Sequence, residues 1–397
     1  MTMKKILIRI LIVLLALILI AGIAIFAVWH NELSTFFSMK QLCARDDAHK
    51  DGSVYEMHVK GDFYLEDYIA QGGSKTDAEL IAFITNHITK GLIPMKISES
   101  SIACSSFTAK TPDGDRLFAR NYDFSKTNTC IVITEANPGR HASVSTVDLQ
   151  FLGIPCDSDV STLMQKITCL GAPFVPLDGV NDAGVACGIY MTYQGEGGVA
   201  TDQNTDKPDL NSTMLLRLIL DYADDVDEAV EIARSYDLHD SAKTSFHYMV
   251  ADSTGRSAVL EWVHDTDLTD NDGGLRELVV TYNDNDAHIG EREAAHDWQW
   301  LTNFIIQPGY YENDEAKGGF DRYNHIYDRL VVTDGVLADE QAAMDILAQV
   351  GRRTWNPDSN SITVHSVVYN LTDKTALWIP NEHYDDKNAV FTYTVKK

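Results

Sequence analysis

The residues with the clearest chemical use lie in a predicted β-hairpin around Cys104. Strand-like sequence at 103–110 is followed by the turn Pro112-Asp113-Gly114-Asp115 and by a second run, 116–121, that leads into Asp123. Such a hairpin brings Cys104, at the start of the first strand, beside Arg120 and Asp123 at the end of the second. The guanidinium favours thiolate over thiol, and the carboxylate can hold an amine by a charge-assisted hydrogen bond. The pattern indicates a nucleophilic cysteine with two charged partners.

Other common catalytic motifs do not occur in the sequence. The chain has no GxSxG, HExxH, P-loop or strand-led GxGxxG motif, its 13 histidines lack metal-ligand spacing, and its six cysteines form no CxxC pair. His247 and His365 lie in strand-like runs and are interpreted as core or cross-strand residues. We therefore expect no metal and no cofactor. A net charge of −26, from 58 acidic and 32 basic residues, repels nucleic acid and argues against a nucleic-acid partner.

The hairpin resembles the start of the mature choloylglycine hydrolase and penicillin V acylase family, and more distantly the acid ceramidase group. All are N-terminal nucleophile (Ntn) hydrolases. In that family a nucleophilic Cys opens a strand, a turn of the K-D-G type follows, and an R-N-x-D run closes the hairpin. Here the offsets from Cys104 are 120 − 104 = 16 to Arg120 and 123 − 104 = 19 to Asp123, as the family pattern asks.

Further matches follow in the family's order. The run from Asp178 to Tyr190 is similar to the family segment that leads to an oxyanion-hole position, which falls on Tyr190. Bile salt hydrolases usually carry Asn there and penicillin V acylases Tyr. The resemblance implies Asn283 as the catalytic Asn, although its surroundings depart from the usual T-N-x-P and Asn285 is an alternative. It also implies Arg322, in Phe320-Asp321-Arg322-Tyr323, as the late arginine of the site.

The resemblance implies a cysteine Ntn hydrolase that cuts itself between Ala103 and Cys104. The freed α-amine would serve as base, and the thiolate would attack a linear amide of an N-acyl compound. Tyr190 favours a penicillin V acylase-like or N-acyl lipid amide substrate over conjugated bile acids. Two alternatives stay open, an acyltransferase of the same fold and an unprocessed surface binding module. Taken singly, each site residue also has a purely structural interpretation, but their order over nearly 300 residues favours the enzyme.

Strand patterns outnumber helical ones after residue 103, which predicts an α+β fold with antiparallel sheets. The resemblance makes this the four-layer αββα Ntn hydrolase fold. Strands are expected at 54–59, 103–110, 116–121, 130–135, 143–151, 185–193, 247–252, 257–262, 278–282, 364–370 and 376–379. Helices are expected at 63–70, 77–89, 213–221, 226–236 and 339–350.

The N-terminal segment predicts a membrane anchor. Lys4, Lys5 and Arg9 precede an apolar run from Ile10 to Trp29, 20 residues that span a hydrocarbon core of about 30 Å. The flanking positive charge predicts a single-pass protein of the cell membrane with its catalytic domain outside the cytoplasm. A cleaved signal peptide is the alternative. We expect a cytoplasmic N-terminus (1–9), the anchor (10–29), a stalk and propeptide (30–103) and the Ntn hydrolase domain (104–397), with the oligomeric state, a homo-oligomer included, left open.

Overall fold

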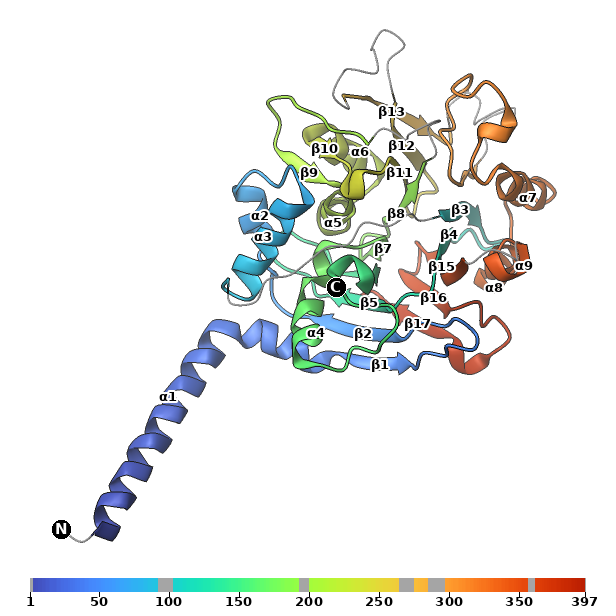
Figure 1. Cartoon of the computed structure of the whole chain (residues 1–397). Coiled ribbons are helices and arrows are strands. Elements are labelled where there is room, and N and C mark those ends of the chain that lie inside the picture. The colour runs from blue at the N-terminus through green and yellow to red at the C-terminus, as the bar shows by residue number, and fades with distance from the viewer. Residues whose placement is uncertain are drawn as a thin grey trace.

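Two large β-sheets dominate the computed structural model, which describes residues 3–91, 103–192, 200–263, 275–284, 297–355 and 361–396 (Figure 1). The nine-stranded sheet has the order β1 (Lys40–Cys43), β2 (Val54–Val59), β5 (Thr129–Thr134), β6 (Ser143–Asp148), β7 (Asp178–Asn181), β8 (Ala186–Met191), β11 (Phe246–Ala251), β12 (Ser257–Val263), β13 (Glu277–Tyr282). The six-stranded sheet has the order β14 (Trp300–Leu301), β3 (Ala103–Lys110), β4 (Arg116–Phe124), β15 (Ile362–Asn370), β16 (Thr375–Pro380), β17 (Phe391–Thr394). A small parallel pair joins β9 (Asp209–Asn211) to β10 (Asp237–His239).

The helices include several that pack on the two large sheets and a long N-terminal helix whose first part projects from the domain. Those of the described chain are α1 (Met3–Ser38), α2 (Leu65–Ala70), α3 (Asp77–Ile88), α4 (Leu163–Thr168), α5 (Ser212–Tyr222), α6 (Val226–Ser235), α7 (Phe320–Val331), α8 (Glu340–Gln349) and α9 (Arg352–Trp355). Helices α5 and α6 pack on the nine-stranded sheet, and α7 and α8 pack on the six-stranded sheet. Hydrogen bonds such as Trp378 Nε1 to Thr146 Oγ1, 3.2 Å, join the facing sheets. The predicted α+β class with antiparallel sheets is confirmed, apart from the parallel pairing of β2 with β5.

The predicted elements of the core agree closely with the observed ones. Strands β2 and β3 have the predicted bounds, and the other predicted strands and helices differ from the observed ones mostly by one to three residues at their ends. The sequence patterns missed β7 because it has only four residues, one of them glycine. They also missed α7, which begins directly after Gly319 at φ +73.

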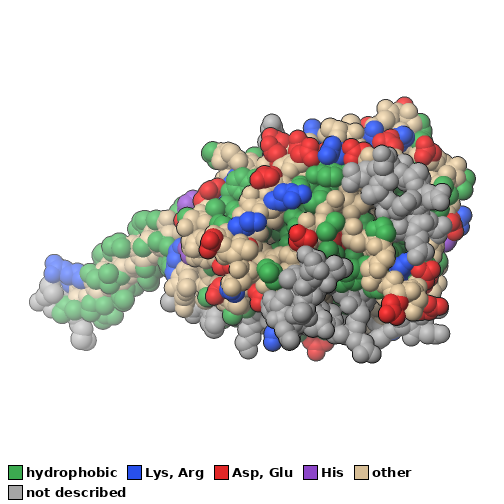
Figure 2. All heavy atoms as spheres, turned by 90° about the horizontal axis from the view of Figure 1, so that it is seen from above, with side chains coloured by type: hydrophobic (Ala, Val, Ile, Leu, Met, Phe, Trp, Pro, Cys, Tyr) green, Lys and Arg blue, Asp and Glu red, His purple; other side chains and the backbone are tan. Residues whose placement is uncertain are grey.

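Helix α1 has two unlike parts that meet at Trp29, where the backbone leaves helical geometry. The first part projects from the domain as an isolated apolar rod (Figure 2). It is long and apolar enough to cross a membrane, a property that signal sequences share. The second part, expected as the start of a stalk, lies against β2. There the Thr35 hydroxyl accepts from Lys60 N at 2.9 Å, and the Ser38 hydroxyl accepts from His58 N at 2.9 Å.

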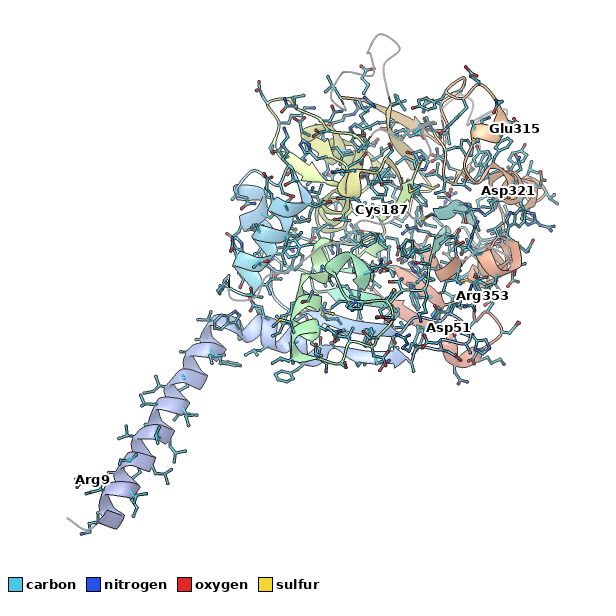
Figure 3. All side chains as sticks on the ribbon, in the orientation of Figure 1. Arg9, Asp51, Cys187, Glu315, Asp321 and Arg353 are labelled. Atoms are coloured by element: carbon cyan, nitrogen blue, oxygen red, sulfur yellow. The ribbon has the colours of Figure 1, made fainter. Side chains whose placement is uncertain are left out.

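The rest of the segment before Cys104 is built into the domain. Strand β2 is buried and pairs with β1 on one side and β5 on the other. At the end of the β1–β2 connection, Asp51 accepts hydrogen bonds from Arg353 Nη2 at 2.7 Å and from His383 Nε2 at 2.7 Å (Figure 3). Strands β1 and β2 are therefore part of the sheet, and Asp51 ties the connection between them to the domain.

Candidate active site

The β3–β4 hairpin buries Cys104 and places its Sγ atom 3.8 Å from Ile189 O in β8 of the facing sheet. In its register, Ala103 is opposite Asp123 and Cys104 is opposite Tyr122. The connecting turn contains Gly114 at φ +97, a conformation that glycine adopts without strain. The predicted hairpin is thereby confirmed, and its register brings the backbone of Cys104 beside Asp123.

One ion pair faces the sulfur of Cys104. The Arg120 guanidinium lies 3.4 Å from Cys104 Sγ through Nη2, which also donates to Ile189 O at 2.6 Å. Its other terminal nitrogen, Nη1, forms a fully buried ion pair with Asp178. Asp178 accepts two more hydrogen bonds, from His365 Nε2 at 2.8 Å and Tyr369 Oη at 2.6 Å. Arg120 is thus held rigidly beside the thiol.

A second ion pair faces the backbone of Cys104. Arg322 Nη1 donates to Cys104 O at 2.8 Å and to Asp123 Oδ2 at 3.1 Å. Arg322 Nη2 donates to Asn303 Oδ1 at 2.8 Å, and the same oxygen accepts from Cys104 N at 3.1 Å. The other carboxylate oxygen of Asp123 accepts from Thr363 Oγ1 at 2.7 Å. A cation and two oxygen acceptors therefore surround the nitrogen and carbonyl of the candidate nucleophile.

The protonation preferences follow from the complete burial of these groups. Burial raises the pKa of the Cys104 thiol, against a smaller lowering by Arg120. Burial likewise raises the pKa of Asp123, against the lowering effects of Arg322 and Thr363. For Asp178 burial is outweighed, and His365 and Arg120 lower its pKa to about 2. In the uncut chain the thiol consequently holds its proton, so it needs a nearby base to become a nucleophile.

Tyr190, in β8, faces Arg120 across the gap between the sheets. The Arg120 Cζ atom lies 5.0 Å from the centre of the tyrosine ring. A side chain at Gly188 would come within 2.6 Å of Tyr190 Oη, so the glycine makes room for the ring. Within the described part of the chain, this buried hydroxyl has no hydrogen-bond partner of good geometry. The structure thus places a buried hydroxyl group close to the Arg120 side of the site, with the Ser106 side chain near it.

The structure does not bring Asn283 to Cys104. Tyr190 is in register with Val279 three strands away, and Asn283 follows four residues later. These steps amount to about 14 Å across the sheet and about 13 Å along it. The Asn283 side chain instead accepts from Ser257 N at 2.9 Å and donates to Gly255 O at 3.0 Å, closing the turn between β11 and β12. The alternative residue, Asn285, lies outside the described residues.

Asn303, rather than Asn283, lies beside Cys104, and its Oδ1 atom accepts a hydrogen bond from Cys104 N. It follows β14, and its Nδ2 atom donates to Met191 O at 2.9 Å. The segment is fixed from behind by His247, whose Nε2 lies 2.9 Å from Thr302 O and whose Nδ1 lies 3.0 Å from Glu261 Oε1. The dipeptide Thr302-Asn303 is the signal that could have identified it, because it preserves the Thr-Asn of the family's T-N-x-P pattern.

The site contains no arrangement typical of a metal centre. Among the residues that the structure describes, no three His, Cys, Asp or Glu side chains are grouped to hold an ion. All six cysteines are free thiols. His247 and His365 are both buried partners of carboxylates, in keeping with their interpretation as core residues.

Comparison with known proteins agrees with the geometry around Cys104. Residues 104–275 match the model of the linear amide C-N hydrolases, choloylglycine hydrolase family, so the match begins at the candidate nucleophile itself. No curated protein sequence matches the chain.

Solved structures of three amide hydrolases are similar to the chain. Penicillin V acylase from Agrobacterium tumefaciens has 17% identity and a TM-score of 0.43, over 70% of this chain and 83% of that one. A mutant conjugated bile acid hydrolase from Clostridium perfringens has 15% identity and a TM-score of 0.43, over 74% and 97%. The Caenorhabditis elegans ortholog of N-acylethanolamine-hydrolyzing acid amidase has 12% identity and a TM-score of 0.38, over 74% and 100%. Because these scores are low, the assignment to a family rests on the family match alone.

Proposed function

Because the chain belongs to the choloylglycine hydrolase family of linear amide C-N hydrolases, we propose that it is a cysteine Ntn hydrolase of N-acyl compounds. The observation that carries the proposal is that Cys104 has two separate sets of partners, one at its sulfur and one at its backbone nitrogen. Its sulfur lies beside Arg120, and its nitrogen lies beside Asn303 and opposite the Asp123 end of the hairpin. A residue that is both nucleophile and base needs one set of partners for each role.

The first proposed step is self-cleavage between Ala103 and Cys104. The Cys104 thiol attacks the carbonyl carbon of Ala103, the C–N bond breaks, and the thiol proton passes to the departing nitrogen. The resulting thioester is hydrolysed by water, which leaves a free α-amine on Cys104. The reference pKa of such an amine is about 7.7 to 8.0, so it can accept a proton near neutral pH. Asp123 and Asn303 supply acceptors that orient it.

In each turnover the amine takes the thiol proton, and the thiolate attacks the carbonyl carbon of the substrate amide. Arg120 stabilises the thiolate. We propose Asn303, through its amide nitrogen, and Tyr190, through its hydroxyl, as donors to the oxyanion, each worth roughly 3 kcal/mol in comparable sites. The amine product leaves with a proton, and water releases the acyl group from sulfur. Arg322 keeps Asp123 and Asn303 in place.

Asp178 is proposed as a positioning residue for this reaction. It does not contact the sulfur, but it fixes Nη1 of Arg120 and leaves Nη2 directed at Cys104. The additional donors His365 and Tyr369 keep the carboxylate ionised and in one orientation. Without this pairing the guanidinium could turn away from the thiolate.

The proposed substrates are linear amides with an acyl chain on one side and a small polar amine on the other. Tyr190 supports penicillin V-like or N-acyl lipid amides over conjugated bile acids. The proposed location is the cell membrane, with α1 as a single-pass anchor and the catalytic domain outside the cytoplasm. The length and apolar surface of its first part support an anchor.

The decisive experiment combines mass and turnover measurements on the full chain. Intact-mass analysis of the parent should show a cut between residues 103 and 104, and the cut protein should hydrolyse members of a panel of linear amides. The Cys104→Ser variant should remain largely uncut and lose turnover, whereas Cys187→Ser, a change of a buried cysteine outside the site, should be cut normally.

Three results would contradict the proposal or redirect it. A parent chain that is never cut would favour the binding module. Acyl transfer to an added free amine in preference to water would favour the acyltransferase. Hydrolysis by the Cys104→Ser variant at the parental rate would show that the nucleophile lies elsewhere.

A further inference from the structure

An apolar groove lies where α1 meets the folded domain. Its volume is about 320 Å³. It is formed by side chains of α1, the end of α3 and α4, and the segments next to them: Ile25, Trp29, Glu32, Leu33, Phe36, Phe37, Ile88, Thr89, Leu163, Ile167 and Leu170. The only charged member, Glu32, accepts a hydrogen bond from the Tyr64 hydroxyl and so does not require solvent.

The groove is continuous with the rod of α1. Ile25 belongs to the last turn of the apolar rod, and it lines the same groove as Leu163 of α4. Trp29, four residues after Ile25, stands at the kink and donates through Nε1 to Ile88 O at 3.1 Å. Four residues correspond to about 6 Å of helix. If the rod spans a bilayer, α4 therefore lies at the depth where the hydrocarbon ends, a level that tryptophan favours.

Exposed apolar side chains surround the groove on the domain side. Outside the rod, five large apolar side chains are exposed in the described part of the chain, and three of them are here. These three are Phe37, Leu163 and Met164, with 77%, 68% and 52% of their surface exposed. A gathering of this kind beside an apolar cavity marks a contact surface, because water disfavours it. We call these three residues and the groove the apolar platform.

We propose that the apolar platform binds the acyl chains of membrane lipids, so that the catalytic domain lies directly on the bilayer. One lipid chain fills the groove between α1 and α4, while Phe37, Leu163 and Met164 enter the outer part of the lipid layer. The inference rests on the proposed anchoring by α1 and is independent of the catalytic assignment. Lipid binding by the apolar platform would hold the catalytic domain against the membrane in one orientation, instead of leaving it flexibly connected.

Photo-crosslinking to lipid tests this inference on the full chain. The protein is placed in nanodiscs, one molecule per disc, made of phosphatidylcholine with a fraction that carries a diazirine in its acyl chain. After illumination, labelled residues are mapped by mass spectrometry. We expect adducts on the rod and also on the peptides that contain Phe37 and Leu163-Met164. The exposed pair Val331-Val332 at the end of α7, with 42% and 82% exposure, is the internal control and should carry none.

A matched pair of variants makes the result specific. Leu163→Gln with Met164→Gln should abolish labelling of α4 and leave the rod labelled, whereas Val331→Gln with Val332→Gln should change nothing. Adducts confined to the rod would overturn the platform while leaving the anchor intact. Adducts on neither would refute the anchor and the platform together. Loss of the lipid adducts on α4 when two copies share a disc, with the adducts on the rod unchanged, would assign the groove to a second copy and overturn the proposal.

Discussion

The two sides of Cys104 carry similar ion pairs with different properties. On the sulfur side, Arg120 and Asp178 are completely buried, and Asp178 accepts hydrogen bonds from two further donors. On the backbone side, Arg322 and Asp123 are also buried, and Asp123 accepts one further side-chain hydrogen bond, from Thr363. Besides its arginine, Asp178 therefore has one more side-chain hydrogen-bond donor than Asp123.

The pKa values of the two carboxylates express this difference. His365 and Arg120 outweigh burial and lower the pKa of Asp178 to about 2, which keeps it ionised. Burial outweighs Arg322 and raises the pKa of Asp123. A fixed charge suits the stabilisation of a thiolate, and a carboxyl group that exchanges protons more easily suits the neighbourhood of an amine that acts as base. We therefore expect Asp178, on the sulfur side, to stay charged, and Asp123, on the backbone side, to gain and lose its proton more easily.

Breaking the Arg120–Asp178 pair should have the largest effect on stability. Asp178→Asn leaves Arg120 buried without its counter-charge, and such changes cost about 3 to 5 kcal/mol. Asp123→Asn should cost less, because Arg322 keeps two other acceptors, Cys104 O and Asn303 Oδ1. Urea unfolding of both variants at neutral pH measures the two free energies. Equal losses, or a larger loss for Asp123→Asn, would remove the proposed contrast.

Replacement of the Asn303 side chain, in the variant Asn303→Ala, should have the largest effect on turnover among variants that fold normally. Loss of one oxyanion donor lowers kcat by roughly 100- to 1000-fold in comparable enzymes. Asn283→Ala is the matched control: it should lower the free energy of unfolding by about 1 to 3 kcal/mol, because buried hydrogen bonds are lost, without changing turnover per folded molecule. The measurement is kcat with a linear amide substrate. A loss of turnover in Asn283→Ala alone would restore the original sequence prediction.

The two carboxylates should affect the pH dependence of stability in opposite directions. Because the folded-state pKa of Asp123 is raised above 3.8, its contribution is fully present below that pH and is lost as the pH rises through the folded value. Asp178, lowered to about 2, contributes above pH 3.8 and loses that contribution as the pH falls through the folded value. Unfolding free energies of the parent, Asp123→Asn and Asp178→Asn, measured from acidic to neutral pH, test both signs. Parallel curves for all three proteins would contradict the assignment.

The smallest expected effects come from the neutral hydrogen bonds to each carboxylate. Thr363→Val removes a hydrogen-bond donor from Asp123 and should raise the pKa of that carboxyl group further. The acidic limb of the plot of kcat against pH should therefore move to higher pH. Tyr369→Phe removes a donor from Asp178 and should lower the free energy of unfolding by about 1 kcal/mol without moving that limb. A kcat profile recorded for both variants separates the two outcomes, and an equal shift in both would contradict the comparison.

The sequence predicted the parts of the site that depend on local geometry. The distance between Cys104 and Arg120 is fixed by one hairpin, and the turn residues determine the register of that hairpin. Tyr190 and Arg322 were located by resemblance, and both lie close to Cys104 or its partners. Their roles in catalysis remain proposals for the variants above to test.

The position of Asn303 could not be derived in the same way. It is 199 residues from Cys104 along the chain, and it reaches the site only because β14 pairs with β3 at the edge of the sheet. Strand β14 has two residues, too few for a recognisable alternation of apolar and polar side chains. Strand β13 is longer and more regular, and the sequence prediction placed the catalytic Asn directly after it, at Asn283. Among the described strands, the shortest one positions the residue that was most difficult to predict.

The burial of β2 between β1 and β5 has a consequence for the protein after the proposed cut. Severing the backbone before Cys104 would leave the proposed membrane helix on one fragment and the proposed nucleophile on the other. The two fragments would still share a continuous ladder between β2 and β5 and the contact of Arg353 with Asp51. The enzyme would then be retained at the membrane by non-covalent association alone, so that mild denaturation, rather than a protease, would release an active site from its anchor.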